Sequence, residues 1–145
     1  MTDTSVPADP FHCTCAVLRG ASRRLSRRYD AALAPLGLSL NQYSILSRLA
    51  RVGSADLGRL AEMLAMDRST LGHLMRPLTA KAWVEPLGDP ADRRRAVLRL
   101  TASGHAILEA GRPVVQRLQT ELETTLGEED AARLVALLDR VASLP

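Results

Sequence analysis

Residues able to bind an anion gather in the stretch DPADRRRAVLRLT, which begins at Asp89. Three consecutive arginines, Arg93, Arg94 and Arg95, follow two acids and a turn-forming proline. Each guanidinium is a planar fork of N–H donors that matches the oxygens of a phosphate or a carboxylate. Asp89 and Asp92 can hold one arginine in a fixed orientation while another points outward. The chemistry predicted for this stretch is therefore the binding of a polyanion.

Positive charge is concentrated in the middle of the chain. The 145 residues carry a formal net charge of +3. Residues 48–99 carry a net charge of +4, whereas the chain from residue 111 onward carries −2. This distribution favours a polyanion as the partner of the middle segment, and an arginine-rich but merely solvated surface is the alternative.

A second set of polar side chains recurs at helical spacing in residues 67–80. Leu71, Leu74 and Leu78 form the apolar stripe of the helix expected there. The opposite stripe carries Arg68, Ser69, Thr70, His73 and Arg76. Hydroxyl, imidazole and guanidinium groups of this kind contact phosphates and base edges. Ordinary solvated polarity is the alternative interpretation.

The stretch FHCTC brings two thiols and an imidazole together near the N-terminus. His12, Cys13 and Cys15 could bind a soft metal if the segment is extended, but not if it is helical, because helical neighbours two apart diverge. One thiol could instead sense oxidation near the positive end of a helix. Both could also be small apolar residues at a subunit interface. A disulfide between them is not expected, since a Cys-x-Cys ring is strained.

No pattern of residues indicates an enzyme. The three histidines are His12, His73 and His105, and neither His73 nor His105 lies in a Ser/His/Asp or metal-ligand pattern. A glycine-rich phosphate loop is absent from the sequence, and no cofactor is predicted to be required. A cysteine hydrolase using Cys13 or Cys15 with His12 is the least favoured function, because it would need a cleft at a fraying terminus.

The surrounding sequence predicts the helices that position these groups. Apolar residues recur every three or four positions from Leu18 to Leu36, which predicts a long helix ending near Pro35 to Gly37. Ser39 and Gln42 have the spacing of a capping box, so a second helix is expected up to about residue 51.

Two short helices follow. Ser54 is expected to cap a helix that carries Leu57, Leu60, Ala61 and Leu64, and Asp67 to cap the next one. Only Ala65 and Met66 separate these helices. Two amphipathic helices joined by so tight a turn must cross steeply, which indicates a helix-turn-helix.

A β-hairpin and two further helices complete the predicted order ααααββαα. Residues 84–100 alternate as strand, loop and strand, and Pro86 restricts the first strand to a sheet edge. Thr101 is expected to cap a long helix, and a last helix should begin at Glu128. The apolar residues that this last helix is expected to bury are Leu134, Leu137, Leu138 and Val141.

A helix-turn-helix followed directly by a basic hairpin predicts a winged helix-turn-helix fold, mainly α with a small β-hairpin. In this architecture the second helix lies in a major groove of double-stranded DNA, and the hairpin reaches the neighbouring minor groove. That groove is narrow and strongly negative, so it favours guanidinium groups. A helical protein-interaction domain is the alternative, but it leaves the arginine-tipped hairpin unexplained.

The chain resembles the MarR family of bacterial transcriptional regulators over about residues 11–144. DPADRRRAVLRLTASG is similar to the wing signature of that family, and LGRLAEMLAMDRSTLGHLMRPL to its helix pair. The resemblance implies that Arg94 enters the minor groove with Asp92 as its orienting partner. The sequence departs from the family where Ala82 stands in place of a frequent glycine after the recognition helix.

The resemblance further implies a homodimeric repressor on a near-palindromic operator. Residues 11–38 and 101–145 would form the dimerisation helices, residues 39–100 the DNA-binding region, and residues 1–10 a disordered N-terminus. The signal that releases DNA would be a small molecule, thiol oxidation or a metal. Tyr29, Tyr43 and Arg48 are candidate lining residues of an effector pocket, with tyrosines in the core as the alternative.

The sequence predicts a cytoplasmic protein that does not interact with membranes. It has no run of about 18 apolar residues that could cross a bilayer. The N-terminal stretch MTDTSVPADP lacks the basic start and apolar core of a secretory signal.

Overall fold

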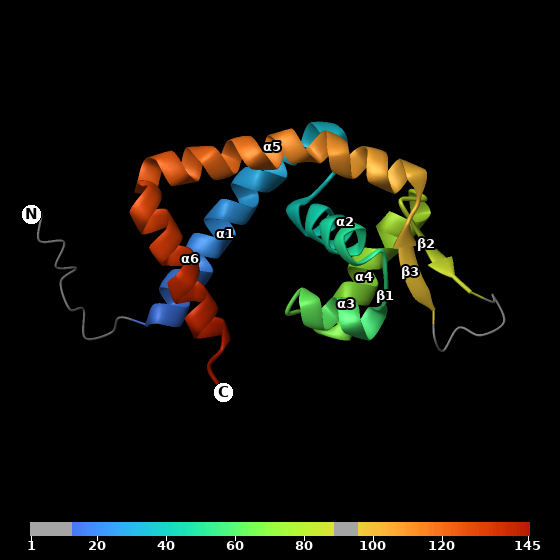
Figure 1. Ribbon diagram of the computed structural model, residues 1–145, viewed down its shortest axis with the longest axis horizontal. Helices are drawn as coiled ribbons and strands as arrows, with labels where there is room; N and C mark the ends of the chain where they lie inside the picture. Colours follow the sequence, from blue (N-terminus) through green and yellow to red (C-terminus); the bar gives the residue numbers. More distant parts are fainter. Residues whose placement is uncertain (1–12, 89–95) are drawn as a thin grey trace, which may run out of the picture.

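The computed structural model describes residues 13–88 and 96–145 (Figure 1). The first helix, α1 (Thr14–Leu33), continues into one 3-10 turn, η1 (Ala34–Leu36). Gly37 then adopts a left-handed conformation with φ of 70° and ends the segment. The α-helix thus ends at Leu33, and the end of the helical segment predicted near Pro35 to Gly37 is confirmed for the 3-10 turn.

Helix α2 (Leu40–Val52) begins with the predicted capping box. The Gln42 backbone N–H donates to Ser39 Oγ at 3.2 Å, and the Ser39 N–H donates to Gln42 Oε1 at 3.0 Å. Asp30 of α1 accepts a further hydrogen bond from the Leu40 N–H at 2.7 Å. These bonds satisfy N–H groups that a helix start leaves without partners, and the last one ties α1 to α2.

Helix α3 (Leu57–Met63) begins differently from the prediction. Asp56 caps it, because its carboxylate accepts from the Arg59 N–H at 2.9 Å. Ser54 instead starts a short strand, β1 (Ser54–Asp56), in which it pairs with Arg99. The prediction of Ser54 as the cap was wrong because this pairing holds the segment extended and moves the helix start two residues along the chain.

Helix α4 (Arg68–Ala80) is capped by Asp67, as predicted. The sheet that follows has the antiparallel order β1-β3-β2, with β2 spanning Val84–Leu87 and β3 spanning Val97–Leu100. Pro86 lies in the edge strand β2, where its missing N–H costs no ladder bond. The predicted hairpin is present, and β1 adds a third strand that is too short to give a recognisable alternation.

Helix α5 (Ala102–Leu126) begins at Thr101, whose hydroxyl accepts from the Gly104 N–H at 3.0 Å. It runs the length of the molecule to the last helix, α6 (Glu128–Ala142), as Figure 1 shows. The predicted starts of both helices are confirmed. Within the described residues no helix has the length and hydropathy needed to cross a membrane.

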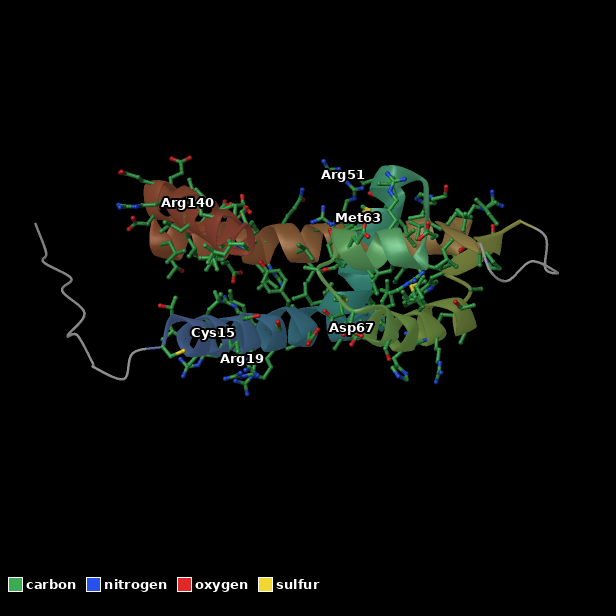
Figure 2. The ribbon with its side chains drawn as sticks, turned by 90° about the horizontal axis from the view of Figure 1, so that it is seen from below. Cys15, Arg19, Arg51, Met63, Asp67 and Arg140 are labelled. Carbon is green, nitrogen blue, oxygen red and sulfur yellow. The ribbon has the colours of Figure 1, made fainter. Side chains whose placement is uncertain are left out.

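The molecule has two regions that differ in packing. The lobe comprises residues 33–88 and 96–111, and the arm comprises residues 13–32 and 112–145. Nearly all fully buried apolar side chains belong to one cluster in the lobe, and Leu46, Leu60 and Leu78 are completely buried there. In the arm, α1 and α6 lie on opposite sides of the molecule (Figure 2).

The last helix is not buried within one chain. Leu134, Leu137, Leu138 and Val141, which were expected to be buried, are 37% to 45% exposed. The expectation is wrong for the single chain because α6 extends from the far end of α5, away from the core of the lobe (Figure 1).

Candidate nucleic-acid interface

The predicted polar stripe lies on the outer face of α4. Leu71, Met75 and Leu78 on the inner face are buried in the core of the lobe. The five candidate contact residues Arg68, Ser69, Thr70, His73 and Arg76 are all exposed. Each carries a group that can bind a phosphate or a base edge, so this face has the chemistry that a recognition helix needs.

Asp67 and Thr70 organise the start of α4. The Thr70 backbone N–H donates to Asp67 Oδ1 at 2.7 Å, and the Thr70 hydroxyl donates to Asp67 Oδ2 at 2.6 Å. The Thr70 hydroxyl, followed by backbone N–H groups, lowers the pKa of the Asp67 carboxyl below its usual value. In the free protein, therefore, the hydroxyl proton of Thr70 is already engaged, and its oxygen remains available as an acceptor.

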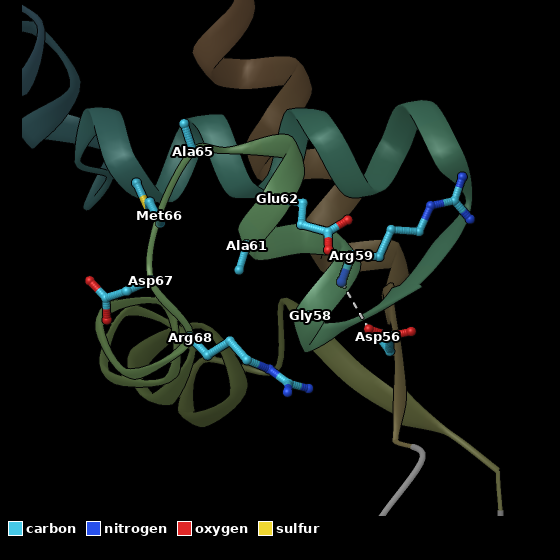
Figure 3. A pocket seen from close by; sticks show the side chains of 9 residues that line it. All are labelled: Asp56, Gly58, Arg59, Ala61, Glu62, Ala65, Met66, Asp67 and Arg68. Atoms are coloured by element: carbon cyan, nitrogen blue, oxygen red, sulfur yellow. Dashed lines mark hydrogen bonds between the residues drawn. The ribbon is translucent and has the colours of Figure 1, made fainter. Parts of the chain in front are cut away.

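Arg68 reaches back from α4 across the start of α3 (Figure 3). A Cβ added at Gly58 would lie 3.2 Å from both Arg68 Nη2 and Asp56 Oδ1. The absence of a side chain at Gly58 therefore leaves room for the guanidinium, a role that the sequence pattern did not reveal. The hollow of about 720 Å³ between the two helices is lined by Asp56, Gly58, Arg59, Ala61, Glu62, Ala65, Met66, Asp67 and Arg68.

A left-handed residue makes the turn between α3 and α4. Ala65 has φ of 51°, and the Met66 N–H donates to the Ala61 carbonyl at 2.9 Å. This conformation redirects the chain between the end of α3 at Met63 and the start of α4 at Arg68, and the polar face of α4 then lies outward. The tight helix-turn-helix predicted from the sequence is thus present.

The hairpin presents its strands beside α4, but its tip lies outside the described residues. Arg99 Nε and Glu85 Oε1 form an ion pair of 2.8 Å across the two strands. Both side chains are exposed, so the pair contributes little stability. The tip candidates Asp89, Asp92, Arg93, Arg94 and Arg95 all fall in the segment that is not described.

The base of the hairpin is held by contacts that the sequence did not predict. Ala82 adopts φ of 54°, the conformation for which glycine is usual. Its carbonyl accepts hydrogen bonds from Thr101 Oγ1 at 2.6 Å and Ser103 Oγ at 2.9 Å. Gly104 passes so close to the Trp83 backbone that an added Cβ would overlap the carbonyl oxygen. The start of α5 therefore fixes the strand that leads to the wing.

Lys81 connects the end of α4 to the turn between α1 and α2. Its Nζ donates to the Gly37 carbonyl at 2.7 Å and lies 4.3 Å from the centre of the Trp83 ring. Trp83 and Lys81 thus link α4, the hairpin and the turn between α1 and α2, and no spacing in the sequence indicated this contact.

Cys13 and Cys15 are both exposed and are not joined by a disulfide. Cys13 is the residue before α1, and Cys15 lies in its first turn. His12 falls outside the described residues. In the part of the chain that is described, no three His, Cys, Asp or Glu side chains are grouped to hold a metal.

Two of the three candidate pocket residues lie together. Tyr43 and Arg48 line one hollow beside α2, and Tyr29 is not among its lining residues. Burial raises the pKa of the hydroxyl of Tyr29 and of that of Tyr43 above the usual value.

The steeply crossed helix pair, the exposed polar face of α4 and the adjoining hairpin define a winged helix-turn-helix protein. A family model described as "MarR family" matches residues 36–95. The multiple antibiotic resistance protein MarR of Escherichia coli is 30% identical over 121 residues, covering 83% of this chain and 84% of the relative. The transcriptional repressor NicR of Pseudomonas putida is 30% identical over 142 residues, covering 94% and 88%.

Solved structures agree with the sequence relatives. A mutant of E. coli MarR complexed with operator DNA has a TM-score of 0.79 at 29% identity, covering 90% of this chain and 92% of that one. The M. tuberculosis transcriptional regulator MOSR in complex with DNA has a TM-score of 0.77 at 30% identity, covering 90% and 96%. This chain therefore belongs to the MarR family. Members of this family are transcriptional regulators and not enzymes, in agreement with the sequence prediction.

Proposed function

We propose that this protein is a homodimeric repressor that binds a near-palindromic operator in double-stranded DNA. Helix α4 of each subunit would enter one of two successive major grooves, so the half-sites would lie about one helical turn apart. Two relatives of known structure, MarR of E. coli and MOSR of M. tuberculosis, are complexed with DNA. The proposed location of the protein is the cytoplasm, because its DNA partner lies in the cytoplasm.

Apolar side chains of the arm that remain exposed among the described residues support the proposal of a homodimer. The apolar side chains exposed there are Val17, Leu18, Leu126, Leu134, Val135, Leu137, Leu138, Val141 and Leu144. Exposed apolar side chains in this number on a monomer are a liability that association removes. A two-fold axis would place the arm of one subunit on the same surface of the other and hold two α4 helices at a set distance.

The candidate residues would make different kinds of contact with DNA. Ser69 and Thr70 would contact phosphates or bases, His73 a base edge, and Arg76 a phosphate or guanine. The wing would insert Arg94 into the minor groove, held by Asp89 and Asp92, while Arg93 and Arg95 contact phosphates.

DNA release would follow a small molecule, thiol oxidation or metal binding. The candidate residues for a small molecule are Tyr29, Tyr43 and Arg48. Those for thiol chemistry are Cys13 and Cys15, and His12 joins them for a metal. The exposed position of both cysteines supports their access to an oxidant.

The central experiment measures binding to duplex DNA from upstream of the protein's own gene, together with molar mass by light scattering. We expect a dimer whose affinity for this DNA exceeds that for a scrambled duplex and falls as salt rises. Arg94→Ala should weaken operator binding, and Arg93→Gln should flatten the salt slope by about one unit. A strictly monomeric protein, or undiminished affinity of Arg94→Ala, would contradict the proposal.

A second set of measurements separates the release signals. Operator affinity of the wild type, Cys13→Ser and Cys15→Ser is measured with and without oxidant, and with Zn²⁺ or Cu⁺. Loss of affinity in the wild type but not in one serine variant identifies that thiol as the sensor. Unchanged affinity under all these conditions excludes both thiol signals and leaves a small molecule as the effector.

A further inference from the structure

The end of α4 has a fixed backbone geometry. The Ala82 N–H donates to the Thr79 carbonyl at 2.9 Å, and the Trp83 N–H donates to the Leu78 carbonyl at 3.0 Å. Together with the left-handed Ala82, these two bonds form a Schellman motif, which ends a helix in one defined conformation. The backbone therefore sets the directions in which Lys81 and Trp83 leave the helix.

Backbone contacts tie this helix end to the start of α5. The Trp83 carbonyl accepts a hydrogen bond from the Thr101 N–H at 3.1 Å. The Ala82 carbonyl accepts from the hydroxyls of Thr101 and Ser103. A side chain at Gly104 would collide with the Trp83 carbonyl, so the two segments are in direct contact. Because α5 continues into the arm, these contacts form one connection between α4 and the arm.

The side chain of Lys81 makes a second connection, on another side of the helix end. Its Nζ donates to the Gly37 carbonyl at 2.7 Å and lies 4.3 Å from the centre of the Trp83 ring. Gly37 is itself held to the end of the preceding helical segment, because its N–H donates to the Ala34 carbonyl at 2.9 Å. Among the described residues, no other hydrogen bond joins the segment from α1 to Gly37 with the segment from α4 to Trp83.

All three surroundings of the Lys81 ammonium favour a positive charge. The Gly37 carbonyl accepts a charge-assisted hydrogen bond, the Trp83 ring presents its negative face, and the C-terminal end of α4 carries the negative end of the helix dipole. Lys81 is nevertheless exposed and makes no part of the buried core. Its loss should therefore change the orientation of α4 without unfolding the lobe.

We propose that Lys81 is a positioning residue for DNA recognition, which fixes α4 against the turn after α1 and so sets the half-site spacing that the dimer accepts. The inference rests on the dimeric DNA-binding function proposed above. The arms would join the two subunits, so the angle of α4 to its own arm determines the separation of the two α4 helices. One added base pair moves a half-site by about 3.4 Å along DNA and by about 34° around it, which a fixed pair of helices cannot follow.

Fluorescence of the DNA-free protein tests the contact by itself. Trp83 is the only tryptophan of the chain, so its emission reports on this corner alone. Lys81→Met keeps the length of the side chain but removes the charge and the donor, whereas Lys81→Arg keeps both. We expect Lys81→Met to shift the emission and to increase its quenching by acrylamide, and Lys81→Arg to resemble the wild type. Identical emission and quenching in Lys81→Met and the wild type would overturn the proposal.

Operator duplexes with altered half-site spacing test the effect on recognition. The operator upstream of the protein's own gene is compared with duplexes in which the half-sites lie one base pair closer or farther apart. In Lys81→Met, the preference for the natural spacing should fall roughly fivefold, as for loss of one exposed hydrogen bond to a charged group. Lys81→Arg should retain the preference. Arg117→Met is the matched control for charge, since it removes one exposed cation of α5 outside this corner.

The salt dependence of binding separates positioning from direct contact with DNA. If Lys81 neutralised a phosphate, Lys81→Met would reduce the slope of log affinity against log salt by about one unit on every duplex. We expect an unchanged slope and a changed spacing preference. A reduced slope with an unchanged preference would assign Lys81 to phosphate binding and overturn the proposal.

Chemical acetylation repeats the test without a substitution. Lys81 is the only lysine of the chain, so an N-hydroxysuccinimide ester of acetic acid modifies it and the N-terminal amine. Acetylated wild type should lose spacing preference as Lys81→Met does, whereas acetylated Lys81→Arg should retain it. Equal loss in both would attribute the effect to the N-terminal amine and contradict the assignment.

The two proposals fail in different ways. An unchanged spacing preference in Lys81→Met, with operator binding intact, refutes the role of Lys81 and leaves the proposed function standing. Absence of operator binding in the wild type under any condition refutes the proposed function and with it the effect on half-site spacing. The fluorescence measurement then still decides whether Lys81 holds the end of α4.

Discussion

The lobe and the arm contain similar proportions of leucine, but they differ in how far their leucine side chains are buried within one chain. In the lobe, Leu46, Leu60 and Leu78 are completely buried within one chain. In the arm, Leu137 and Leu138 remain 45% and 37% exposed. The lobe therefore obtains its stability from its own sequence, whereas the arm is complete only against a second surface. The predictions below test this difference, from the largest expected effect to the smallest.

Removal of a core side chain in the lobe should have the largest effect. Leu46→Ala leaves a cavity in a region where neighbours cannot close in, so it should lower the free energy of unfolding by about 3 kcal/mol. Because the lobe is closed within one chain, the loss should be the same at low and high protein concentration. Denaturant unfolding at two concentrations measures it, and a loss confined to dilute protein would contradict the comparison.

Truncation in the arm should act through association. Leu138→Ala removes apolar surface that remains exposed in one chain, worth about 1 kcal/mol per subunit if a partner covers it. Two subunits contribute, so the dissociation constant of the dimer should rise roughly thirtyfold. Sedimentation equilibrium measures this constant. Unchanged association would show that α6 lies outside the dimer interface.

The corrected helix cap in the lobe gives a paired test. Asp56→Ala removes the side chain that caps α3 and should cost about 1 kcal/mol of unfolding free energy. Ser54→Ala is the matched control, since Ser54 lies in β1 and should change stability by less than about 0.5 kcal/mol. Thermal or denaturant unfolding compares them, and a larger loss in the serine variant would restore Ser54 as the cap.

Replacement of Ala82, the left-handed residue before the wing, by glycine should stabilise the lobe slightly. Ala82→Gly relieves the strain of a Cβ at φ of 54°. The gain is partly offset by the greater freedom of glycine in the unfolded chain, which leaves a net gain of about 0.5 kcal/mol. Chemical unfolding measures it, and a net destabilisation would show that the methyl group makes a favourable contact.

The smallest effect should be a pH dependence at the start of α4. The folded pKa of Asp67 is lowered, chiefly by the Thr70 hydroxyl, so its contribution to stability is present above the unfolded pKa. That contribution is lost as pH falls from about 4 through the folded value. Asp67→Asn should flatten this part of the stability profile, and an identical profile in the variant would refute the assignment.

Local signals predicted most of the lobe and the starts of α2, α4, α5 and α6. Ser39 with Gln42, and Asp67 before α4, are caps because their side chains bond to backbone only three residues away. Such contacts depend on neighbours in sequence and can be read without a structure. Ser54 misled the prediction because its partner, Arg99, is distant in the chain.

The candidate nucleic-acid interface could be predicted from the sequence to the same degree as the helices of the lobe. The outward stripe of α4 follows from helical spacing, and the structure places it as expected. The contact of Lys81 with Gly37 joins residues that are 44 positions apart in the chain. The hollow beside α2 brings Arg48 and Arg51 together with Arg112, which is more than 60 positions away. No periodicity or motif relates residues so distant, because their proximity arises only when α2, α4 and α5 pack together.

The sequence by itself determined the helices, the steep helix pair, the basic hairpin and the membership of the family, since these depend on local spacing and on residue types. The tertiary structure alone decided which apolar faces close within one chain and which remain open. It also decided that three arginines surround one hollow and that Ala82 is held in a left-handed turn. Burial and charge clustering are properties of three-dimensional packing, and sequence order constrains them only weakly.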